Sequence, residues 1–272
     1  MANSDYTTDT TSSLFCPNAQ ADGAISPLQT VIPIKNWRAT GTDEVLAGEA
    51  ALVNGEIVKI VSFTTTEIVI ERGCADTIPQ AHADNSRFWF FDDSFGNNRR
   101  EYAGSETVSV KMLPKTASQQ ISIENSPPQP ITFNFRFARP YAPGRVEVNG
   151  SPFTSVATLD PASAALNLSW AHRDRISQFD QLIDHMATSI GPEAGVTYTV
   201  QVFQSNGTLV RTQAGITGAS WSYSLATARS DFGISVGAPV VLTDAYLTLE
   251  AVRDGYTSWQ KYRIDFKISN AA

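Results

Sequence analysis

The amino-acid sequence predicts an all-β protein in which a small antiparallel β barrel or sandwich precedes a larger β-sandwich. Apolar and polar residues alternate in many short runs, for example at Leu166, Leu168 and Trp170, which is the period of a half-buried strand. Turn signals such as Asn54-Gly55 and Asn206-Gly207 separate these runs. Such pairs are typical of antiparallel hairpins, so both domains should be built mainly from them.

The composition narrows the function classes. The chain has 272 residues, which is enough for two domains, and 42% of them are hydrophobic. A net charge of −7 argues against a protein that coats nucleic acid, because such domains are usually basic. No run approaches 18 apolar residues and the first residues do not resemble a signal peptide. We therefore expect that the protein is made in the cytoplasm and that it does not insert into a membrane.

The N-terminal region, residues 1–45, is predicted to be an extended arm. It is polar and rich in Thr and Ser, and it cannot close a core by itself. Its one apolar island consists of Val31, Ile32 and Ile34. These three residues are predicted to contact a partner chain on which the arm becomes ordered.

Residues 46–137 are predicted to form the small β-rich domain. The sequence indicates a three-stranded meander over 46–72, a buried strand over 86–93, a strand over 106–114 and a last strand over 131–137. Trp89 lies inside the continuous apolar run of the strand over 86–93 and is predicted to be a core residue. Three prolines within residues 124–130 give the most linker-like stretch of the chain.

Residues 138–272 are predicted to form the β-sandwich, with Trp170, Tyr198 and Leu249 in its core. A stretch of 25 residues, 171–195, separates two of its strands and is long enough to need its own structure or function. Leu182, Ile183 and Met186 fit one helical face there. Two interpretations stay open: a helical cap over the end of the sandwich, or a docking loop.

The order of motifs from 140 to 270 resembles a fibronectin type III domain. That family has a strand ending Leu-x-Val/Leu-x-Trp, then a Tyr-x-Val strand, and later a strand ending Ala-Val-x-x-Gly. The matching residues are Leu166, Leu168 and Trp170, then Tyr198 and Val200, then Ala251, Val252 and Gly255. The resemblance implies a fibronectin type III-like β-sandwich. One departure is Ala245, which occupies the position of the family's corner tyrosine.

No arrangement of reactive side chains predicts catalysis, a cofactor or a metal. None of the three histidines belongs to an HExxH motif, and no Gly-x-Gly-x-x-Gly segment is present. Cys16 and Cys74 are too few for a zinc site and can be either free thiols or one disulfide. The sequence therefore predicts no enzyme, no cofactor and no metal site.

A second resemblance, over residues 45–270, is to tail-tip proteins of long-tailed bacteriophages. In that group an Arg-Gly-x-x-Asp-Thr-x-Pro-x-x-His segment precedes a proline-gated fibronectin-like domain. The matching residues are Arg72, Gly73, Asp76, Thr77, Pro79 and His82. The resemblance implies a structural protein of the virion tail, made in the host cytoplasm. It also implies a homotrimer that contacts the hub, fibre or distal tail proteins.

The leading hypothesis is therefore a structural and assembly protein of a phage tail tip that can support host attachment. The alternative is an adhesin or carbohydrate-binding module that contacts a glycan or protein of the host surface. The predicted partner contacts are the apolar residues of 1–45 and of 171–195 named above. Tyr256 and Trp259, between the last two strands, are the predicted aromatic contacts of an adhesin.

Overall fold

The computed structural model describes residues 6, 16–39, 45–92 and 100–272. These residues belong to two compact units. One unit holds residue 6 and 100–138, and the other holds the remaining described residues. The chain is nearly all β, as predicted.

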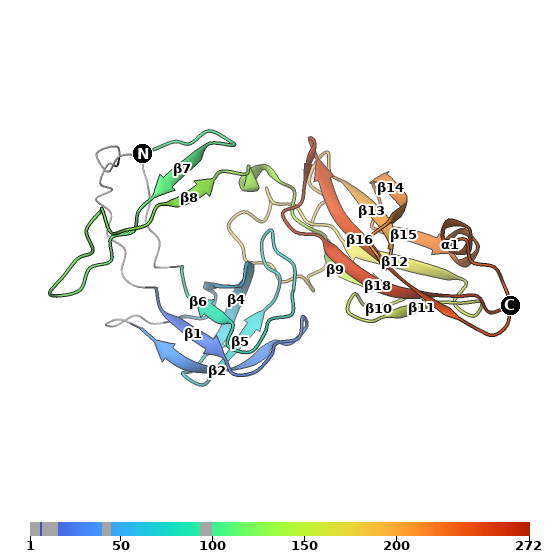
Figure 1. Ribbon diagram of the computed structural model, residues 1–272, viewed down its shortest axis with the longest axis horizontal. Coiled ribbons are helices and arrows are strands. Elements are labelled where there is room, and N and C mark those ends of the chain that lie inside the picture. The colour runs from blue at the N-terminus through green and yellow to red at the C-terminus, as the bar shows by residue number, and fades with distance from the viewer. Residues whose placement is uncertain (1–5, 7–15, 40–44, 93–99) are drawn as a thin grey trace. The chain divides into compact units, whose positions relative to one another are not determined.

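A closed antiparallel barrel forms the N-terminal half of the larger unit, with strand order β1-β2-β5-β4-β3-β6 (Figure 1). Its strands are β1 (Asn18–Ala21), β2 (Val31–Arg38), β3 (Ala50–Val53), β4 (Glu56–Phe63), β5 (Glu67–Glu71) and β6 (Arg87–Trp89). The β3–β4 hairpin turns at Asn54 and Gly55, whose φ angles of 45° and 89° suit a type I′ turn. Pairing of β1 with β6 closes the barrel.

The barrel corrects the prediction of an arm over 1–45. Residues 18–21 and 31–38 are strands of the closed sheet, while residues 1–5, 7–15 and 40–44 lie outside the described residues. Ile32 and Ile34 are buried in the barrel core, and only Val31 is exposed. Strand pairing across the barrel explains the difference, because it gives this apolar island a core within its own chain.

Trp89 also differs from its predicted place. It is 37% exposed, whereas its neighbours Phe88 and Phe90 are buried. Successive side chains of a strand point to opposite faces, so a continuous apolar run must place some members outside. Arg87 covers the exposed indole, with its guanidinium carbon 5.4 Å from the ring centre.

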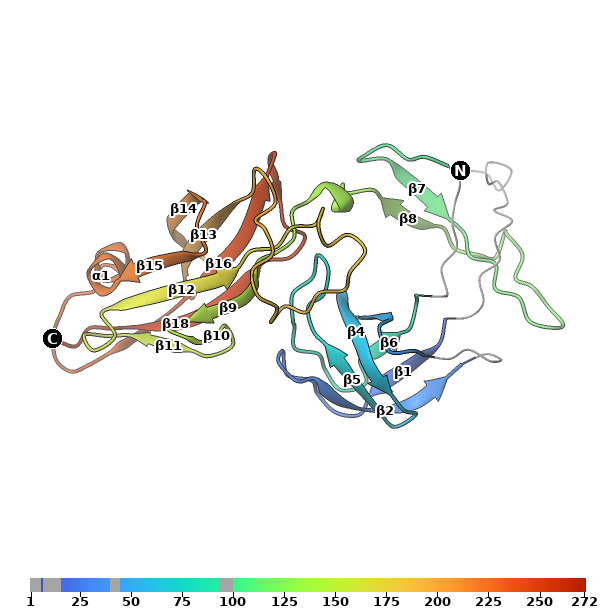
Figure 2. The ribbon, with the colours of Figure 1, turned by 180° about the vertical axis from the view of Figure 1, so that it is seen from behind.

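A β-sandwich forms the other half of the larger unit (Figures 1 and 2). One sheet has the order β10-β9-β12-β15 and contains β9 (Gly144–Val148), β10 (Ser151–Pro152), β12 (Ala165–Ala171) and β15 (Ser220–Ser224). The other has the order β11-β18-β16-β13-β14 and contains β11 (Ala157–Leu159), β13 (Thr197–Gln204), β14 (Leu209–Ile216), β16 (Leu242–Arg253) and β18 (Tyr262–Ser269). The short β17 (Tyr256–Thr257) pairs with β16.

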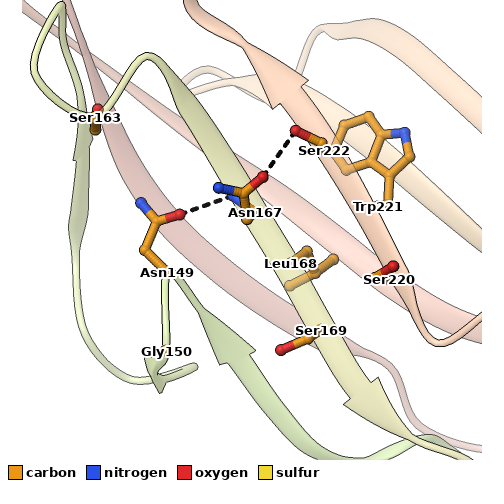
Figure 3. A pocket seen from close by; sticks show the side chains of 9 residues that line it. All are labelled: Asn149, Gly150, Ser163, Asn167, Leu168, Ser169, Ser220, Trp221 and Ser222. Atoms are coloured by element: carbon orange, nitrogen blue, oxygen red, sulfur yellow. Dashed lines mark hydrogen bonds between the residues drawn. The ribbon is translucent and has the colours of Figure 1, made fainter.

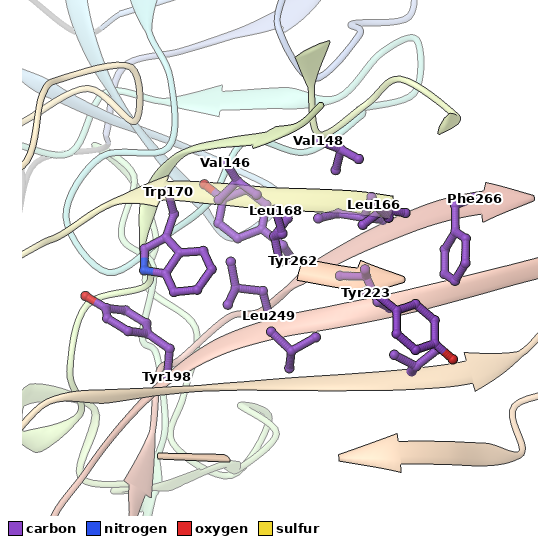
Figure 4. Close-up of a cluster of buried hydrophobic side chains, with 14 of the residues drawn as sticks. Val146, Val148, Leu166, Leu168, Trp170, Tyr198, Tyr223, Leu249, Tyr262 and Phe266 are labelled. Carbon is purple, nitrogen blue, oxygen red and sulfur yellow. The ribbon is translucent and has the colours of Figure 1, made fainter. Parts of the chain in front are cut away.

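The sandwich core lies between these sheets (Figure 4). Trp170, Tyr198 and Leu249 are 5%, 1% and 0% exposed, so the structure places all three in the core. The centres of the Trp170 and Tyr198 rings are 5.1 Å apart. Alternation along the strands delivers these side chains to one face of each sheet.

One helix, α1 (Leu225–Phe232), follows β15 at the end of the sandwich that carries the C-terminus (Figures 1 and 2). The Ser224 side chain accepts a hydrogen bond from the Thr227 N–H, which caps the first turn. Gly233 ends the helix in the left-handed conformation, with φ 63°. Arg229 donates to the carbonyl oxygen of Ser269, so the helix holds the last strand.

The smaller unit contains a separate two-stranded sheet of β7 (Thr107–Val110) and β8 (Gln129–Thr132), followed by a 3-10 helix (Arg136–Ala138). The predicted single domain over 46–137 is thus divided between two units, because β7 and β8 do not pair with the barrel. The predicted strand over 131–137 ends at Thr132.

Candidate functional site

The Arg-Gly-x-x-Asp-Thr-x-Pro-x-x-His segment surrounds a buried carboxylate, that of Glu56. Arg72 donates from Nε and Nη2 to the two oxygens of Glu56, at 2.8 Å each. His82 Nε2 lies 2.7 Å from Glu56 Oε2 and must carry a hydrogen, because an ionised carboxylate only accepts. The backbone N–H groups of Gly73 and Gln80 also donate to Glu56, each at 3.0 Å.

Every donor of the Arg72 guanidinium is used in the same network. Beyond its two bonds to Glu56, it donates to the carbonyl oxygens of Ser26, Gln29 and Gln80. Burial alone would raise the pKa of Glu56, but the hydrogen bonds from Arg72 and His82 and the charge of Arg72 hold that pKa below its ordinary value. The group is a closed structural network, and Arg72 and Glu56 have no exposed side-chain surface.

The remaining motif residues shape the turn that carries the network. The Thr77 hydroxyl donates to the Cys74 carbonyl oxygen at 2.8 Å, and the Ile57 N–H donates to Thr77 Oγ1 at 3.0 Å. Gly73 has φ 58°, and a Cβ there would lie 2.5 Å from Pro79 Cδ. Glycine is therefore required at this position by both conformation and space. These motif residues act inside the barrel rather than on its surface.

Residues 171–195 contain no helix, which corrects the predicted helical face of Leu182, Ile183 and Met186. The segment instead folds around the guanidinium of Arg173, which is 6% exposed. Arg173 donates to the carbonyl oxygens of His172, Asp184, His185, Ala187 and Thr188. A Cβ on Gly144 would lie 2.0 Å from Arg173 Nη2, so the glycine of β9 leaves room for this side chain.

The same segment joins the sandwich to the barrel. The N–H of His185 donates to the carbonyl oxygen of Arg72 at 3.0 Å, and His185 Nδ1 lies 3.1 Å from that oxygen. A second contact comes from Gln260, whose Oε1 accepts from the Ile78 N–H at 2.8 Å and whose Nε2 donates to the Gly55 carbonyl oxygen at 3.0 Å. These contacts reach backbone groups of the motif segment, residues 72–82, and of the β3–β4 turn.

The other predicted contact residues lie at different depths. Leu182 and Ile183 are half-buried and Met186 is 50% exposed. In the same segment Ile176 and Phe179 are more exposed, at 59% and 80%, and helical spacing did not single them out. An isolated apolar residue in a polar stretch carries no periodic signal, so only the structure reveals these two.

The predicted aromatic pair is partly covered. Tyr256 in β17 is half-buried and Trp259 is 37% exposed. The guanidinium carbon of Arg139 lies 5.7 Å from the centre of the Trp259 ring. Because this cation occupies one face of the indole, that face is unavailable for stacking on a sugar.

A polar pocket of about 740 Å³ lies over β12 and β15 (Figure 3). Asn149 Oδ1 accepts from the Asn167 N–H at 2.8 Å, and Asn167 Oδ1 accepts from Ser222 Oγ at 2.9 Å. These bonds fix which way each amide faces. The two Nδ2 groups are thereby left as oriented donors for a ligand with hydroxyl or carbonyl oxygens.

The β7–β8 unit is held mostly by polar contacts. The hydroxyls of Thr107 and Thr132 lie 2.8 Å apart across the two strands. Lys111 donates to the Ile123 carbonyl oxygen at 2.8 Å. The Tyr102 and Phe133 rings stack with centres 4.5 Å apart.

The described residues 100–138 of this unit contain no buried hydrophobic side chain. Between residues 100 and 138, all of which are described, Ser126 is the one buried residue. Val110, Ile131 and Met112 are exposed to 39%, 47% and 68%. The alternation of Val108, Val110 and Met112 is visible in the sequence, but the exposure of Val110 and Met112 is not. The apolar face of this unit is the candidate interaction surface.

Comparisons with known proteins assign the chain to no family. No protein-family model matches the chain, and no curated protein matches it. A solved Fn3-like protein from Clostridium thermocellum is 18% identical, with a TM-score of 0.25 over 47% of this chain and 91% of that one. The FN1–FN3 domains of chicken CNTN1 are 11% identical, with a TM-score of 0.25 over 91% of this chain and 65% of that one.

The strand order of the C-terminal half defines its class. Strands β9, β12 and β15 lie together in one sheet, and β14, β13, β16 and β18 in the other. This is a fibronectin type III-like β-sandwich, as predicted. Ala245 is buried at the expected tyrosine position, while Tyr246 stacks on Phe203 with ring centres 4.9 Å apart.

The described residues offer neither a metal-binding cluster nor a membrane-spanning helix. No group of three or more His, Cys, Asp or Glu side chains in the described part of the chain could hold a metal ion. Likewise, none of the helices formed by those residues is long and apolar enough to cross a membrane. Cys16 and Cys74 are not joined by a disulfide.

Proposed function

We propose that this protein is a structural and assembly component of the tail tip of a long-tailed bacteriophage. The observation that carries the proposal is the β7–β8 unit, which is folded yet buries no hydrophobic side chain of its own between residues 100 and 138. Ordering a residue costs roughly 1–2 kcal/mol of backbone entropy, which burial normally offsets. A unit of this kind is suited to gain its missing burial from a neighbouring chain.

The phage assignment rests on the motif resemblance over residues 45–270. The arrangement of the larger unit supports a structural role, because hydrogen bonds from His185 and Gln260 join barrel and sandwich. In this proposal the partners are the hub, fibre or distal tail proteins, and the copies follow the threefold symmetry of the tail axis. The chain is made in the host cytoplasm and resides in the virion.

The test uses particles of the phage that encodes this chain. Mass spectrometry of purified particles should detect the wild-type chain. Ile131→Asp should lose incorporation, because it places a charge on the apolar face of the unit. Thr132→Asp, the next residue on the opposite face, is the matched control and should incorporate normally. Particles that lack the wild-type chain would overturn the proposal.

A second candidate function is glycan binding, favoured by the oriented Asn149 and Asn167 amides of the polar pocket. Sugars present many hydroxyl groups that such donors can bind. A glycan array with the purified chain tests it. Asn167→Ala should abolish any binding, whereas Gln201→Ala on the other sheet should leave it unchanged. Absence of binding to every glycan would reject this candidate.

A further inference from the structure

Strand β15 of the sandwich ends its sheet without the usual protection of an edge. It is the last strand of the order β10-β9-β12-β15 and pairs only with β12. Edges normally carry a device against further pairing, such as short length, a bulge or a charge. At the other sandwich edges, β10 and β11 have two and three residues, and β14 shifts its register twice. In contrast, β15 keeps one register over five residues and contains no charged residue or proline.

The pairing with β12 fixes which backbone groups of β15 face outward. The Trp170 N–H donates to the Ala219 carbonyl oxygen at 3.0 Å. Hydrogen-bonded and non-bonded pairs alternate along an antiparallel ladder, so Trp221, two residues further, also bonds to β12. The N–H and C=O groups of Ser220 and Ser222 therefore point toward the free edge.

The two sides of this edge differ in chemistry. On the core side, the rings of Trp221 and Tyr223 stack with their centres 5.4 Å apart. On the outer side, Ser220 and Ser222 are exposed and border the polar pocket (Figure 3). None of the residues that line this pocket is charged. A strand added at the edge would meet aromatic rings with one row of side chains and hydroxyl groups with the other.

We propose that β15 accepts an extended segment of another polypeptide, which adds one strand to this sheet. An edge that offers an N–H and a C=O at every second residue is complemented by another extended backbone, whereas a glycan has no such repeat. The segment should alternate apolar side chains, which face Trp221, with polar ones, which face the serines. This inference does not depend on the tail-tip role.

The polar pocket gives the segment one preferred side chain. Asn167 lies two strand spacings, about 10 Å, from the position of the added strand. The serines between them are small, so a long side chain with a carbonyl oxygen, such as glutamine, can pass over Ser222. Its oxygen can then accept a hydrogen bond from Asn167 Nδ2, whose orientation the bond from Ser222 Oγ to Asn167 Oδ1 fixes.

A random peptide library screened against the purified full-length chain tests the inference. Peptides that bind should alternate apolar and polar residues. Methylation of the backbone nitrogens of a bound peptide, one position at a time, should abolish binding at every second position, because only alternate N–H groups face β15. Effects without this alternation would overturn the inference. So would a chain that binds a glycan but no peptide.

Ser222→Pro gives a second test on the protein side. It removes an N–H that points outward, and proline is tolerated on an edge strand in that position, so melting should stay near that of the wild type. Peptide binding should fall by about tenfold or more, because one donor is lost and the proline ring obstructs the edge. The matched control Ser222→Thr keeps both the N–H and the hydroxyl and should bind like the wild type.

Equal peptide binding by the two variants would contradict the inference. If Ser222→Pro does not fold, the methylation pattern decides by itself. A chain that binds peptides at β15 but is absent from phage particles would refute only the tail-tip proposal. A chain that enters particles but binds no peptide would refute only strand addition.

Discussion

Glu56 illustrates how a charged side chain is kept without any exposed surface. Its carboxylate accepts hydrogen bonds from Arg72, His82 and two backbone N–H groups, so both of its oxygens have several donors. A buried ion pair adds little net stability by itself, but removing one partner leaves a buried charge without compensation. The motif residues are therefore expected to matter for folding of the barrel.

Glu56→Gln should lower the free energy of unfolding by about 3–5 kcal/mol, because the Arg72 charge stays buried without its counter-charge. Calorimetry would measure the loss. The matched control is Glu71→Gln, which breaks the half-exposed pair with Lys59 at 3.0 Å. Such surface pairs contribute about 0–1 kcal/mol, so the control should change little. Equal effects of the two variants would contradict the network's structural role.

The same carboxylate should make stability depend on pH. The folded pKa of Glu56 lies below its ordinary value of 4.5, so its contribution is fully present above pH 4.5. It is lost as the pH falls through the lower folded pKa, because the unfolded chain then binds more protons. Denaturant unfolding between pH 6 and pH 3 should therefore show a falling stability whose slope is smaller in Glu56→Gln. An unchanged slope would place the acid sensitivity elsewhere.

Sequence periodicity placed some residues well and others not. Trp170, Tyr198 and Leu249 lie on alternating strands, and alternation identifies the inward face directly. Trp89 lies in an unbroken apolar run, which has no alternation to mark its outer face. Ile32 is predicted to contact a partner chain because the sequence does not show that its strand pairs with β5, where Ile68 lies opposite it.

At the scale of elements, the segment 171–195 is ordered without regular structure. Arg173 binds carbonyl oxygens that a helix would bind with its own N–H groups. Apolar spacing alone could not reveal this, since a single buried arginine produces no periodic pattern. Helix α1 was missed for a related reason: it is only 8 residues long, and two of them, Leu225 and Ala228, are buried.

Arg173→Met should release the segment, because the carbonyl oxygens it binds lose their donors together. Hydrogen exchange should accelerate at residues whose order depends on it, such as His185 and Ile190, whose N–H groups bond to Arg72 and His172. The strands of the sandwich should exchange as before. Arg145→Met, at a half-exposed arginine beside Glu147, is the control and should leave the segment protected.

At the scale of the whole molecule, the sequence predicts two domains. Their boundaries depend on which strands pair with one another, and the sequence does not show that pairing. The barrel closes through β1 and β6, which places residues 18–21 in the same sheet as residues 87–89. The proline-rich stretch 124–130 was read as a linker between domains. It lies instead inside the unit that contains β8, where Pro130 faces Ser109.

Limited proteolysis should cut first within residues 100–138, where burial is least. The resulting barrel and sandwich fragments should still elute together, because His185 and Gln260 join them and Ile78 packs with the sandwich core. They should separate in denaturant. His185→Ala combined with Gln260→Ala should weaken the association, at about 0.5–1.5 kcal/mol for each hydrogen bond. Fragments that part without denaturant would contradict the joint.

The thiol of Cys74 has a consequence of a different kind. Burial and the nearby charge of Asp184 raise its pKa to about 12, so at pH 7 on the order of one thiol in 10⁵ is ionised. An alkylating reagent can reach it only when the structure around it opens, because Cys74 has no exposed surface, whereas Cys16 is half-buried. The rate at which alkylation adds mass at Cys74 therefore measures how often the structure around this thiol opens, in the wild type and in any variant of the chain.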